Sequence, residues 1–392
     1  NGVPSPKIVS SPYFILLEEK KKVVKQENAK TGVRWVGIDM GKSSYVLRLI
    51  DENGKITGWD GKTNKEGRKE LYRRLRSTDK IAIESCSLAF TMNKEFKELT
   101  GTDFYILNPN KLFQIYMTDK KTDKEDALKL AKEIRDKQEE DLPRVNAPTE
   151  KMKEMRNVMS EYREIVKFRT MKINRLHSVY EHAGITDLKR SDLKTKTNRE
   201  KNLKLLNGYE KEEAQRLMHL IDLLESQKME LENKIKEEEN TNEQMQIEQI
   251  PGIGKTTAFC FVGVIGDPNR FTNMTRVSSY LGFIPKIDCS SKTNHYGHIT
   301  KKGNAYLRGL LVQAAWVIVR SNNGGSLKEK YNDLIIHGMS KKKAVVAIAR
   351  KLAELMYTLL KNHSSYEPRP YTPRTTYVEN LADQALSYAA AS

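Results

Sequence analysis

The stretch VRWVGIDMGKSSYVLRLIDENGKI, residues 33–56, decides the predicted fold of the N-terminal part of the chain. Residues 33–39 form a short apolar run, and residues 45–51 alternate apolar and polar side chains as a half-buried strand does. The turn residues ENG at 52–54 follow directly. The pattern therefore predicts two strands joined to a third through a tight hairpin.

The chain after this hairpin alternates between helical and strand patterns up to residue 140. The order is therefore a strand, a hairpin and a third strand, followed by alternating helices and strands. This order is typical of an α/β unit with a mixed sheet. The expected elements are a helix near 64–77, a strand at 80–84, a helix near 88–99, a strand at 103–107 and a helix at 123–138.

Residues 150–247 are charged and almost entirely helical, with apolar residues that step by three and four. Each of the two heptad-like seams is interrupted once by a basic residue, at Arg169 and at Lys228. One interpretation is a coiled hairpin that pairs with a second copy. The alternative is a long helical pair within one chain.

The remaining segments complete the predicted organisation. Residues 248–363 read as a mainly helical domain that the sequence IPGIG opens, with strong helices near 304–320 and 340–361 and Ser340 as an N-cap. The fold class is α/β plus α. The predicted segments are a flexible leader at 1–32, an α/β domain at 33–149, a helical linker at 150–247, the C-terminal domain at 248–363 and a flexible tail at 364–392.

The charge balance indicates a polyanionic partner. Among 392 residues, 68 Lys and Arg face 51 Asp and Glu, which gives a net charge of +17. Hydrophobic residues make up 38%, enough to bury cores, so wholesale disorder is excluded. Nucleic acid is the usual partner for such a surplus, and a merely soluble, lysine-rich protein is the alternative.

Cysteine usage and hydropathy predict a cytoplasmic protein. The three cysteines, Cys86, Cys260 and Cys289, are far apart and form no C-x-x-C pair, so we expect reduced thiols. The longest apolar stretch, residues 310–319, is too short to cross a bilayer, so no membrane partner is expected. With the basic charge, this favours a location close to the nucleoid.

Four carboxylates form the first candidate site. Asp39 and Glu84 each end an apolar strand run, and an acid in that place lies at the rim of the sheet, where ligands bind in such folds. Asp123 and Asp126 are three residues apart at the start of a helix and so share one face. Such a set suits Mg²⁺, which prefers hard oxygen ligands and bridges carboxylates to phosphates. Each acid alone is better explained as a helix cap or a solvated charge, and only the set in this order favours a metal site.

The second candidate is Ser290, in the stretch YLGFIPKIDCSSK at residues 280–292. A serine needs an activating base, metal or cation to act as a nucleophile, and a serine in a polar loop is otherwise inert. Nearby cations suit a loop that approaches phosphates, with a plain basic turn as the alternative. These cations are Lys292, Lys301, Lys302 and Arg308.

Two further motifs are not predicted to be catalytic sites. The sequence GIGKT at 252–256 resembles the end of a phosphate loop, but Gln249 stands where a Walker motif needs Gly. We instead expect a helix–hairpin–helix-like turn whose amides meet a DNA phosphate, or a plain corner between helices. His295 and His298 lack an accompanying acid or cysteine cluster, so no zinc site is predicted.

Taken together, these stretches resemble one family, the DEDD-type insertion-sequence transposases (the IS-one-ten group) with their related site-specific DNA invertases. The N-terminal part of the resemblance consists of residues 37–42, residues 82–84 and the run TDKEDALKLA at 122–131. The C-terminal part consists of residues 250–254, 280–285 and 297–308. The resemblance covers roughly residues 33–360, with both blocks in the family's order.

The resemblance implies a RuvC-like, RNase-H-type first domain whose four metal-binding acids map to Asp39, Glu84, Asp123 and Asp126. It also implies a coiled-coil linker that dimerises and a C-terminal domain with a nucleophilic serine five residues after a proline. Counting from Pro285 reaches Ser290. The family has glycine next, whereas Ser291 stands here, so Ser291 remains a lesser candidate.

The predicted function is a DNA transposase or recombinase that uses Mg²⁺ and a phosphoserine link. The resemblance further implies a non-coding bridge RNA that pairs with donor and target DNA, and a homo-oligomer, either a dimer or a tetramer. Basic residues of the linker, including Lys172 and Arg175, are candidates for nucleic-acid contacts. The alternatives are a junction-resolving nuclease that uses metal-activated water, and a non-catalytic nucleic-acid-binding scaffold.

Overall fold

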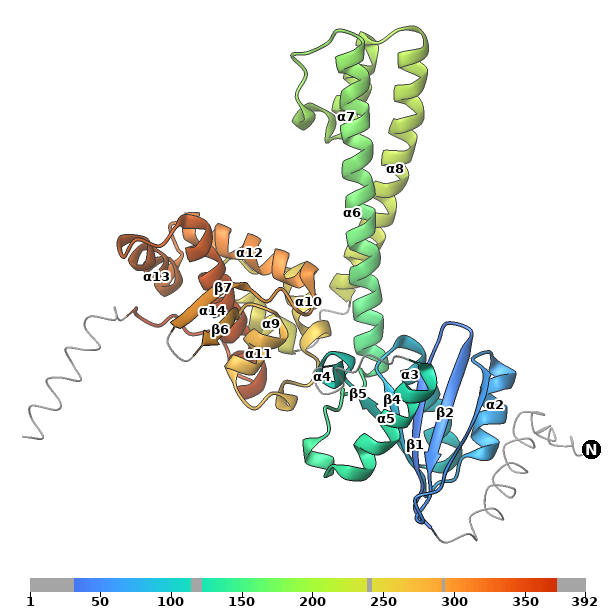
Figure 1. The fold of residues 1–392 in the computed structure, drawn as a ribbon. Coiled ribbons are helices and arrows are strands. Elements are labelled where there is room, and N and C mark those ends of the chain that lie inside the picture. Colours follow the sequence, from blue (N-terminus) through green and yellow to red (C-terminus); the bar gives the residue numbers. More distant parts are fainter. Residues whose placement is uncertain (1–31, 114–121, 238–241, 291–292, 372–392) are drawn as a thin grey trace, which may run out of the picture. The chain divides into compact units, whose positions relative to one another are not determined.

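The computed structural model describes residues 32–113, 122–237, 242–290 and 293–371. Contacts divide the chain into two compact units, Asn1–Ala147 and Pro148–Ser392 (Figure 1). The predicted leader lies outside the described residues except for Gly32, and so does most of the predicted tail. The finer subdivision into five segments remains a prediction.

The N-terminal unit is built on a mixed five-stranded sheet, as the sequence predicts. The strand order is β3-β2-β1-β4-β5. β1 pairs with β2 in antiparallel and with β4 in parallel orientation, so β1 is the central strand at which the sheet changes direction. The strands are β1 (Trp35–Met40), β2 (Ser44–Ile50), β3 (Ile56–Lys62), β4 (Lys80–Glu84) and β5 (Tyr105–Leu107).

The hairpin between β2 and β3 is held by the side chain of Asp51. Its carboxylate accepts hydrogen bonds from the backbone amides of Asn53, at 3.0 Å, and Lys55, at 2.9 Å. Gly54 adopts a φ of 79°, which a residue without a Cβ tolerates best. The turn residues at 52–54 therefore act as the sequence predicts.

Helices cover both faces of this sheet. On one face, Val36 and Ile38 are fully buried in a cluster with Met92 and Phe96. On the other face, Ala82 is buried with Leu130. Pro109 begins a short helix after β5, since proline suits a first helical turn. The helices are α2 (Lys65–Arg74), α3 (Ser87–Thr100), α4 (Pro109–Phe113) and α5 (Asp123–Asp136).

The second unit begins with a long antiparallel helical pair, α6 (Glu150–His182) and α8 (Gly208–Glu237) (Figure 1). The two helices pack against each other within one chain, and their pairing with a second copy remains a prediction. A small head joins them, with the 3-10 helix η2 (Arg190–Leu193), α7 (Lys196–Asn202) and the 3-10 helix η3 (Leu203–Leu205).

Internal ion pairs explain the basic residues that interrupt the two seams. Arg169 donates to the carboxylate of Glu225 at 2.7 Å and to the carbonyl of Lys194 at 3.0 Å. Lys228 donates to Glu232 at 2.7 Å. These basic residues thus form polar layers inside the helical pair.

The rest of the second unit is a helical domain that shares one core with the base of the helical pair. Met155 of α6 and Ile235 of α8 are buried in the same cluster as Phe259 and Leu352. Among the described residues, no helix is long and apolar enough to cross a bilayer. The elements are α9 (Asn242–Glu248), α10 (Lys255–Ile265), α11 (Met274–Tyr280), β6 (Pro285–Ser290), β7 (Thr293–Ile299), α12 (Ala305–Arg320), α13 (Gly325–Ile336) and α14 (Lys341–Asn362).

The sequence IPGIG joins α9 to α10 through a tight corner, and the contact of its amides with a DNA phosphate remains a prediction. Gly252 has a φ of 84°, and a Cβ there would lie 2.8 Å from Cγ1 of Ile318 in α12. Gly254 occupies the N-cap position of α10. The corner is therefore fitted closely against α12.

Candidate functional site

Asp39 and Glu84 lie side by side at the carboxyl ends of two parallel strands. In the register of β1 and β4, Ile38 is opposite Ile83, and the two acids come one residue later. Asp39 also pairs with Val46 of β2, and Glu84 pairs with Leu107 of β5. Both acids therefore sit at the ends of interior strands, and each is paired with the neighbouring strand on its other side, β2 for Asp39 and β5 for Glu84.

The two carboxylates share the face of the sheet that α5 covers. Side chains two residues apart on a strand point to the same face, so Asp39 follows Gly37 and Glu84 follows Ala82. A Cβ on Gly37 would lie 1.9 Å from the carbonyl oxygen of Ala127 in α5. The absence of a side chain at Gly37 thus lets α5 lie directly on β1, and a glycine within an apolar strand is the sequence signal for such an approach.

The other two acids lie on the first turn of α5. Asp126 directly precedes Ala127, the residue that meets Gly37, and its carboxylate accepts from Lys129 at 3.2 Å. Asp123 is the exposed first residue of the helix. Neither carboxylate has to cap the helix, because the Thr122 hydroxyl accepts from the amide of Glu125.

The acids fit a divalent metal ion in ligand type and in location, since carboxylate oxygens are hard donors and all four come from β1, β4 and the helix over them. In the part of the chain that the structure describes, no three His, Cys, Asp or Glu residues lie close enough together to hold a metal ion. Asp39 and Glu84 would form the sheet half of such a site, and at least one carboxylate of α5 would have to approach them.

Ser290 lies at the end of a strand, which corrects the prediction of a polar loop. It is the last residue of β6 and pairs with Thr293, the first residue of β7. The alternating apolar and polar residues of 285–290 were the signal for this strand. Ser291 and Lys292 lie outside the described residues.

The base of the β6–β7 hairpin is held by two glycines that allow close backbone contact. Gly282 and Gly303 have φ values of 74° and 72°. A Cβ on Gly303 would lie 2.1 Å from the carbonyl oxygen of Tyr280, and a Cβ on Gly282 would lie 2.4 Å from that of Lys302. The amide of Lys301 also donates to the carbonyl of Gly282 at 3.2 Å. The segments before and after the hairpin are thereby joined.

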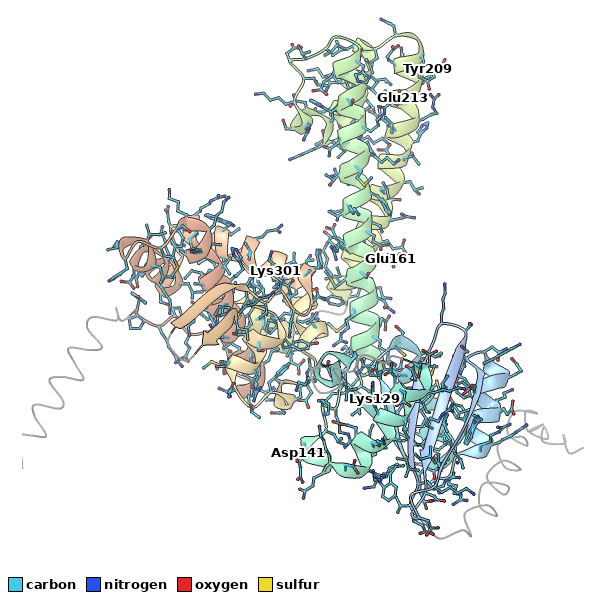
Figure 2. The ribbon with its side chains drawn as sticks, viewed as in Figure 1. Lys129, Asp141, Glu161, Tyr209, Glu213 and Lys301 are labelled. Atoms are coloured by element: carbon cyan, nitrogen blue, oxygen red, sulfur yellow. The ribbon has the colours of Figure 1, made fainter. Side chains whose placement is uncertain are left out.

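Arg308 fastens the same junction, a role that the sequence did not reveal. Its guanidinium donates to the carbonyls of Leu281 and Lys302. Burial lowers the pKa of Arg308. Lys301 and Lys302 are exposed beside it, and Figure 2 shows Lys301 on this domain. Arg308 is therefore a positioning residue for the hairpin, and its contact with phosphate stays a prediction.

The basic residues predicted on the linker differ in their surroundings. Arg175 of α6 pairs with Glu213 of α8, with 2.7 Å between Nη2 and Oε1 (Figure 2 labels Glu213). Lys172 is half-buried. Part of the positive charge of α6 is thus used to hold the helical pair together.

Comparison with known proteins matches both blocks of the chain. Residues 36–183 match the DEDD transposases of the IS110 group, and residues 244–332 match the transposase IS116/IS110/IS902 family. The chain belongs to the IS110 (IS-one-ten) family of DEDD transposases. It is therefore an enzyme of the DNA transposase and recombinase class.

Individual relatives agree with this assignment. The transposase for insertion sequence element IS1111A of Coxiella burnetii is 23% identical over 353 residues, which cover 87% of this chain and 93% of the relative. A probable family 20 transposase of Pseudomonas aeruginosa is 22% identical, covering 85% of this chain and 98% of the relative. The pilin gene-inverting protein of Moraxella lacunata is 31% identical over 121 residues, which cover 31% of this chain and 37% of the relative.

Proposed function

We propose that this family member cuts and rejoins DNA through a covalent bond to Ser290, aided by the carboxylates of the N-terminal unit. The observation that carries the proposal is the placement of Asp39 and Glu84, next to each other on neighbouring parallel strands and on the face under α5. This placement, in a chain that also matches the family's C-terminal block, favours a two-part site over a binding scaffold. We further propose a RuvC-like fold for the N-terminal domain.

In the proposed step, Oγ of Ser290 attacks a backbone phosphorus. The bond from phosphorus to the 3′-oxygen of the preceding nucleotide breaks, and that oxygen leaves as a 3′-hydroxyl after it gains a proton. One phosphodiester is exchanged for another, so the reverse attack by a 3′-hydroxyl rejoins strands without ATP. Serine needs activation for this chemistry, because its hydroxyl is a weak nucleophile.

The four acids supply that activation in the proposal. Asp39, Glu84, Asp123 and Asp126 would hold a divalent metal ion, and Mg²⁺ suits an all-carboxylate set. When bound, the ion would neutralise charge on the phosphate and lower the pKa of the attacking hydroxyl. The acids of one subunit would serve the serine of the same or of another subunit in a dimer or tetramer.

Nucleic-acid contacts in the proposal come from exposed cations of the second unit. Lys301 and Lys302 lie at the hairpin base, and the head carries further exposed basic residues. These are Lys189, Arg190, Lys194, Lys196, Lys201 and Lys204. Lys172, Arg175, Lys292 and Arg308 remain predicted contacts. If a bridge RNA selects the DNA by pairing, the protein needs only to bind duplex shape and backbone.

Ser290→Ala tests the proposal directly. Purified protein, Mg²⁺ and end-labelled DNA of the element boundary are mixed, and covalent protein–DNA adducts are separated on a denaturing gel. The adduct and all strand cleavage should disappear in Ser290→Ala, while Ser291→Ala should keep both. Nicking that survives in Ser290→Ala would instead identify a nuclease that uses water, and adduct loss only in Ser291→Ala would move the nucleophile to Ser291.

A further inference from the structure

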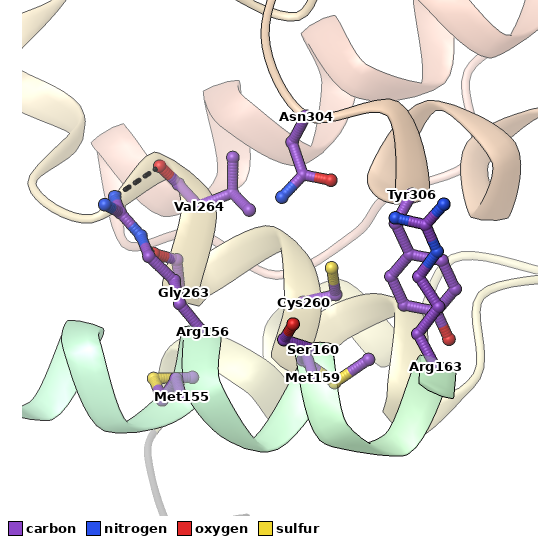
Figure 3. Close-up of a pocket in the computed structure, with 10 residues that line it drawn as sticks. All are labelled: Met155, Arg156, Met159, Ser160, Arg163, Cys260, Gly263, Val264, Asn304 and Tyr306. Atoms are coloured by element: carbon purple, nitrogen blue, oxygen red, sulfur yellow. Dashed lines mark hydrogen bonds between the residues drawn. The ribbon is translucent and has the colours of Figure 1, made fainter. Parts of the chain in front are cut away.

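A small pocket opens between α6, α10 and α12 of the second unit, away from Ser290 in the sequence (Figure 3). Its volume is about 90 Å³. α6 contributes Arg156, Ser160 and Arg163, while Asn304 and Tyr306 come from the start of α12. Cys260 of α10 lies between them.

The residues that line this pocket make it positive. They include two arginines and no acidic side chain. Burial raises the pKa of Tyr306 and that of Cys260 to about 12 each, so the phenol and the thiol stay uncharged at neutral pH. An anion would therefore meet only positive or neutral groups.

One arginine is fixed in the wall and the other is available. Arg156 donates to the carbonyls of Gly263, at 2.8 Å, and Val264, at 3.2 Å, so its guanidinium is held by the backbone of α10 and adds positive charge to the wall. Arg163 lies over the ring of Tyr306, with 5.6 Å from its guanidinium carbon to the ring centre. Arg163 is exposed, and within the described residues it forms no ion pair.

Asn304 adds a directed donor. Its Oδ1 accepts from the amide of Leu307 at 3.0 Å and caps α12, which leaves the amide nitrogen Nδ2 to donate. The 16-residue α12 begins here, so the positive end of its dipole also faces this region. The exposed Lys301 and Lys302 come just before Asn304 and extend the positive surface toward the hairpin base.

We propose that this pocket binds a backbone phosphodiester of the nucleic-acid substrate, with Arg163, Asn304 Nδ2 and the Ser160 hydroxyl as donors. The proposal rests on the proposed nucleic-acid function and adds a contact site to it. Charge-assisted donors around a compact, acid-free pocket are what a phosphate needs. The basic turn at Lys301 and Lys302 would hold neighbouring phosphates of the same strand.

Arg163→Ala tests this site, with Arg216→Ala as the matched control. Arg216 of α8 also lies over a tyrosine ring, 5.4 Å from that of Tyr209, and is exposed, but it does not line this pocket. Binding of a fluorescein-labelled DNA duplex is measured by anisotropy over a series of salt concentrations, and the series is repeated with an RNA duplex.

We expect Arg163→Ala to weaken binding roughly tenfold and to reduce the slope of log affinity against log salt by about 1, as the loss of one phosphate contact does. Arg216→Ala should leave both unchanged. The duplex for which the slope falls identifies the nucleic acid that occupies the pocket. If Arg163→Ala behaves like Arg216→Ala on both duplexes while the wild-type protein binds, this inference fails and the proposed function stands. A wild-type protein that binds neither duplex would contradict the proposed function.

Asn304→Asp provides a second test that preserves the fold. Aspartate caps a helix as well as asparagine does, so α12 should keep its stability in thermal unfolding. The substitution replaces the donor by a negative charge at the pocket, and binding should fall at least tenfold. Unchanged binding by Asn304→Asp would contradict the phosphate site.

Discussion

The carboxylate edge of the N-terminal unit and the serine hairpin of the C-terminal unit are built in opposite ways. Asp39 and Glu84 stand at the ends of interior strands, and the residues before them, Ile38 and Ile83, are fully buried. Ser290 ends a two-stranded sheet of its own, which is joined to the domain by close backbone contacts at Gly282 and Gly303.

This difference shows what fixes the position of the acids and what fixes the position of the serine hairpin. The acids are placed by a hydrophobic core, which many side chains share, so no single contact decides their position. The hairpin depends on a few backbone contacts and on Arg308 at its base. We therefore expect substitutions that remove the charge of an acid to abolish activity without disturbing the fold. At the hairpin, we expect small steric changes that shift the backbone to lower activity.

The largest effect is expected at Asp39. Asp39→Asn keeps the size of the side chain but removes its charge, so the fold should persist while strand cleavage falls roughly a thousandfold, as the loss of metal or oxyanion stabilisation does. Single-turnover cleavage of labelled DNA in Mg²⁺ measures this. Far-ultraviolet circular dichroism checks that the sheet is intact.

Asp60→Asn is the control for Asp39→Asn. Asp60 lies on β3 of the same sheet, with its side chain 54% exposed, and pairs only loosely with Arg48 at 3.4 Å. Its substitution should leave cleavage unchanged. Equal activity of both variants would remove Asp39 from the site and with it the proposed metal-binding role of the sheet edge.

The sequence predicts the carboxylate edge well because its signals are local and regular. The apolar run before Asp39 and the run before Glu84 give strands within one or two residues of β1 and β4. A helix beginning at Asp123 is also where the structure has it. That Asp39 and Glu84 are neighbours, however, depends on the pairing of β1 with β4, which no local pattern contains.

The serine hairpin is predicted poorly for a physical reason. Residues 285–290 alternate apolar and polar side chains, but residues 293–299 (TNHYGHI) are mostly polar, so no second apolar run marks a partner strand and both segments read as loop. The role of Arg308 depends on carbonyl groups 27 and 6 residues away, at Leu281 and Lys302. A basic residue in a glycine-rich stretch predicts phosphate binding, but no local pattern predicts these contacts with the backbone.

A smaller effect is expected at Gly303. Gly303→Ala places a Cβ 2.1 Å from the carbonyl oxygen of Tyr280 in a backbone of φ 72°, so the hairpin base has to shift. We expect a loss of about 2 kcal/mol in the free energy of unfolding of the second unit. Cleavage should fall with it, because Ser290 loses its fixed base. Urea unfolding followed by Trp316 fluorescence, with Trp35 and Trp59 replaced by Phe, isolates this unit.

Gly338→Ala separates the steric clash from backbone strain. Gly338 has a φ of 84°, but a Cβ there would have no atom within 4 Å. Its substitution should cost about 1 kcal/mol and leave cleavage as it is. Equal losses of stability and activity in both variants would show that the contact between Gly303 and Tyr280 does not position the hairpin.

The smallest effect is expected at a buried carboxylate that contacts α11, the helix just before the hairpin. Glu354 of α14 is 5% exposed and accepts from Ser278 of α11 at 3.0 Å, just before the hairpin base. Burial acts to raise the pKa of Glu354, but Lys351, Ser278 and Arg350 donate hydrogen bonds to it, and its pKa lies below the ordinary value. The folded state thus favours the charged form.

Because this pKa is depressed by folding, its contribution to stability is complete above the unfolded value of about 4.3 and is lost as the pH falls through the folded value. The free energy of unfolding reported by Trp316 should therefore drop at acid pH, by about 1 kcal/mol from this group. Glu354→Gln should lower stability at neutral pH and flatten this part of the profile, since the amide does not titrate. If the free energy of unfolding of Glu354→Gln falls at acid pH as steeply as that of the wild type, other carboxylates govern the acid sensitivity of the unit. The contact of Glu354 with Ser278 would then not depend on the charge of Glu354.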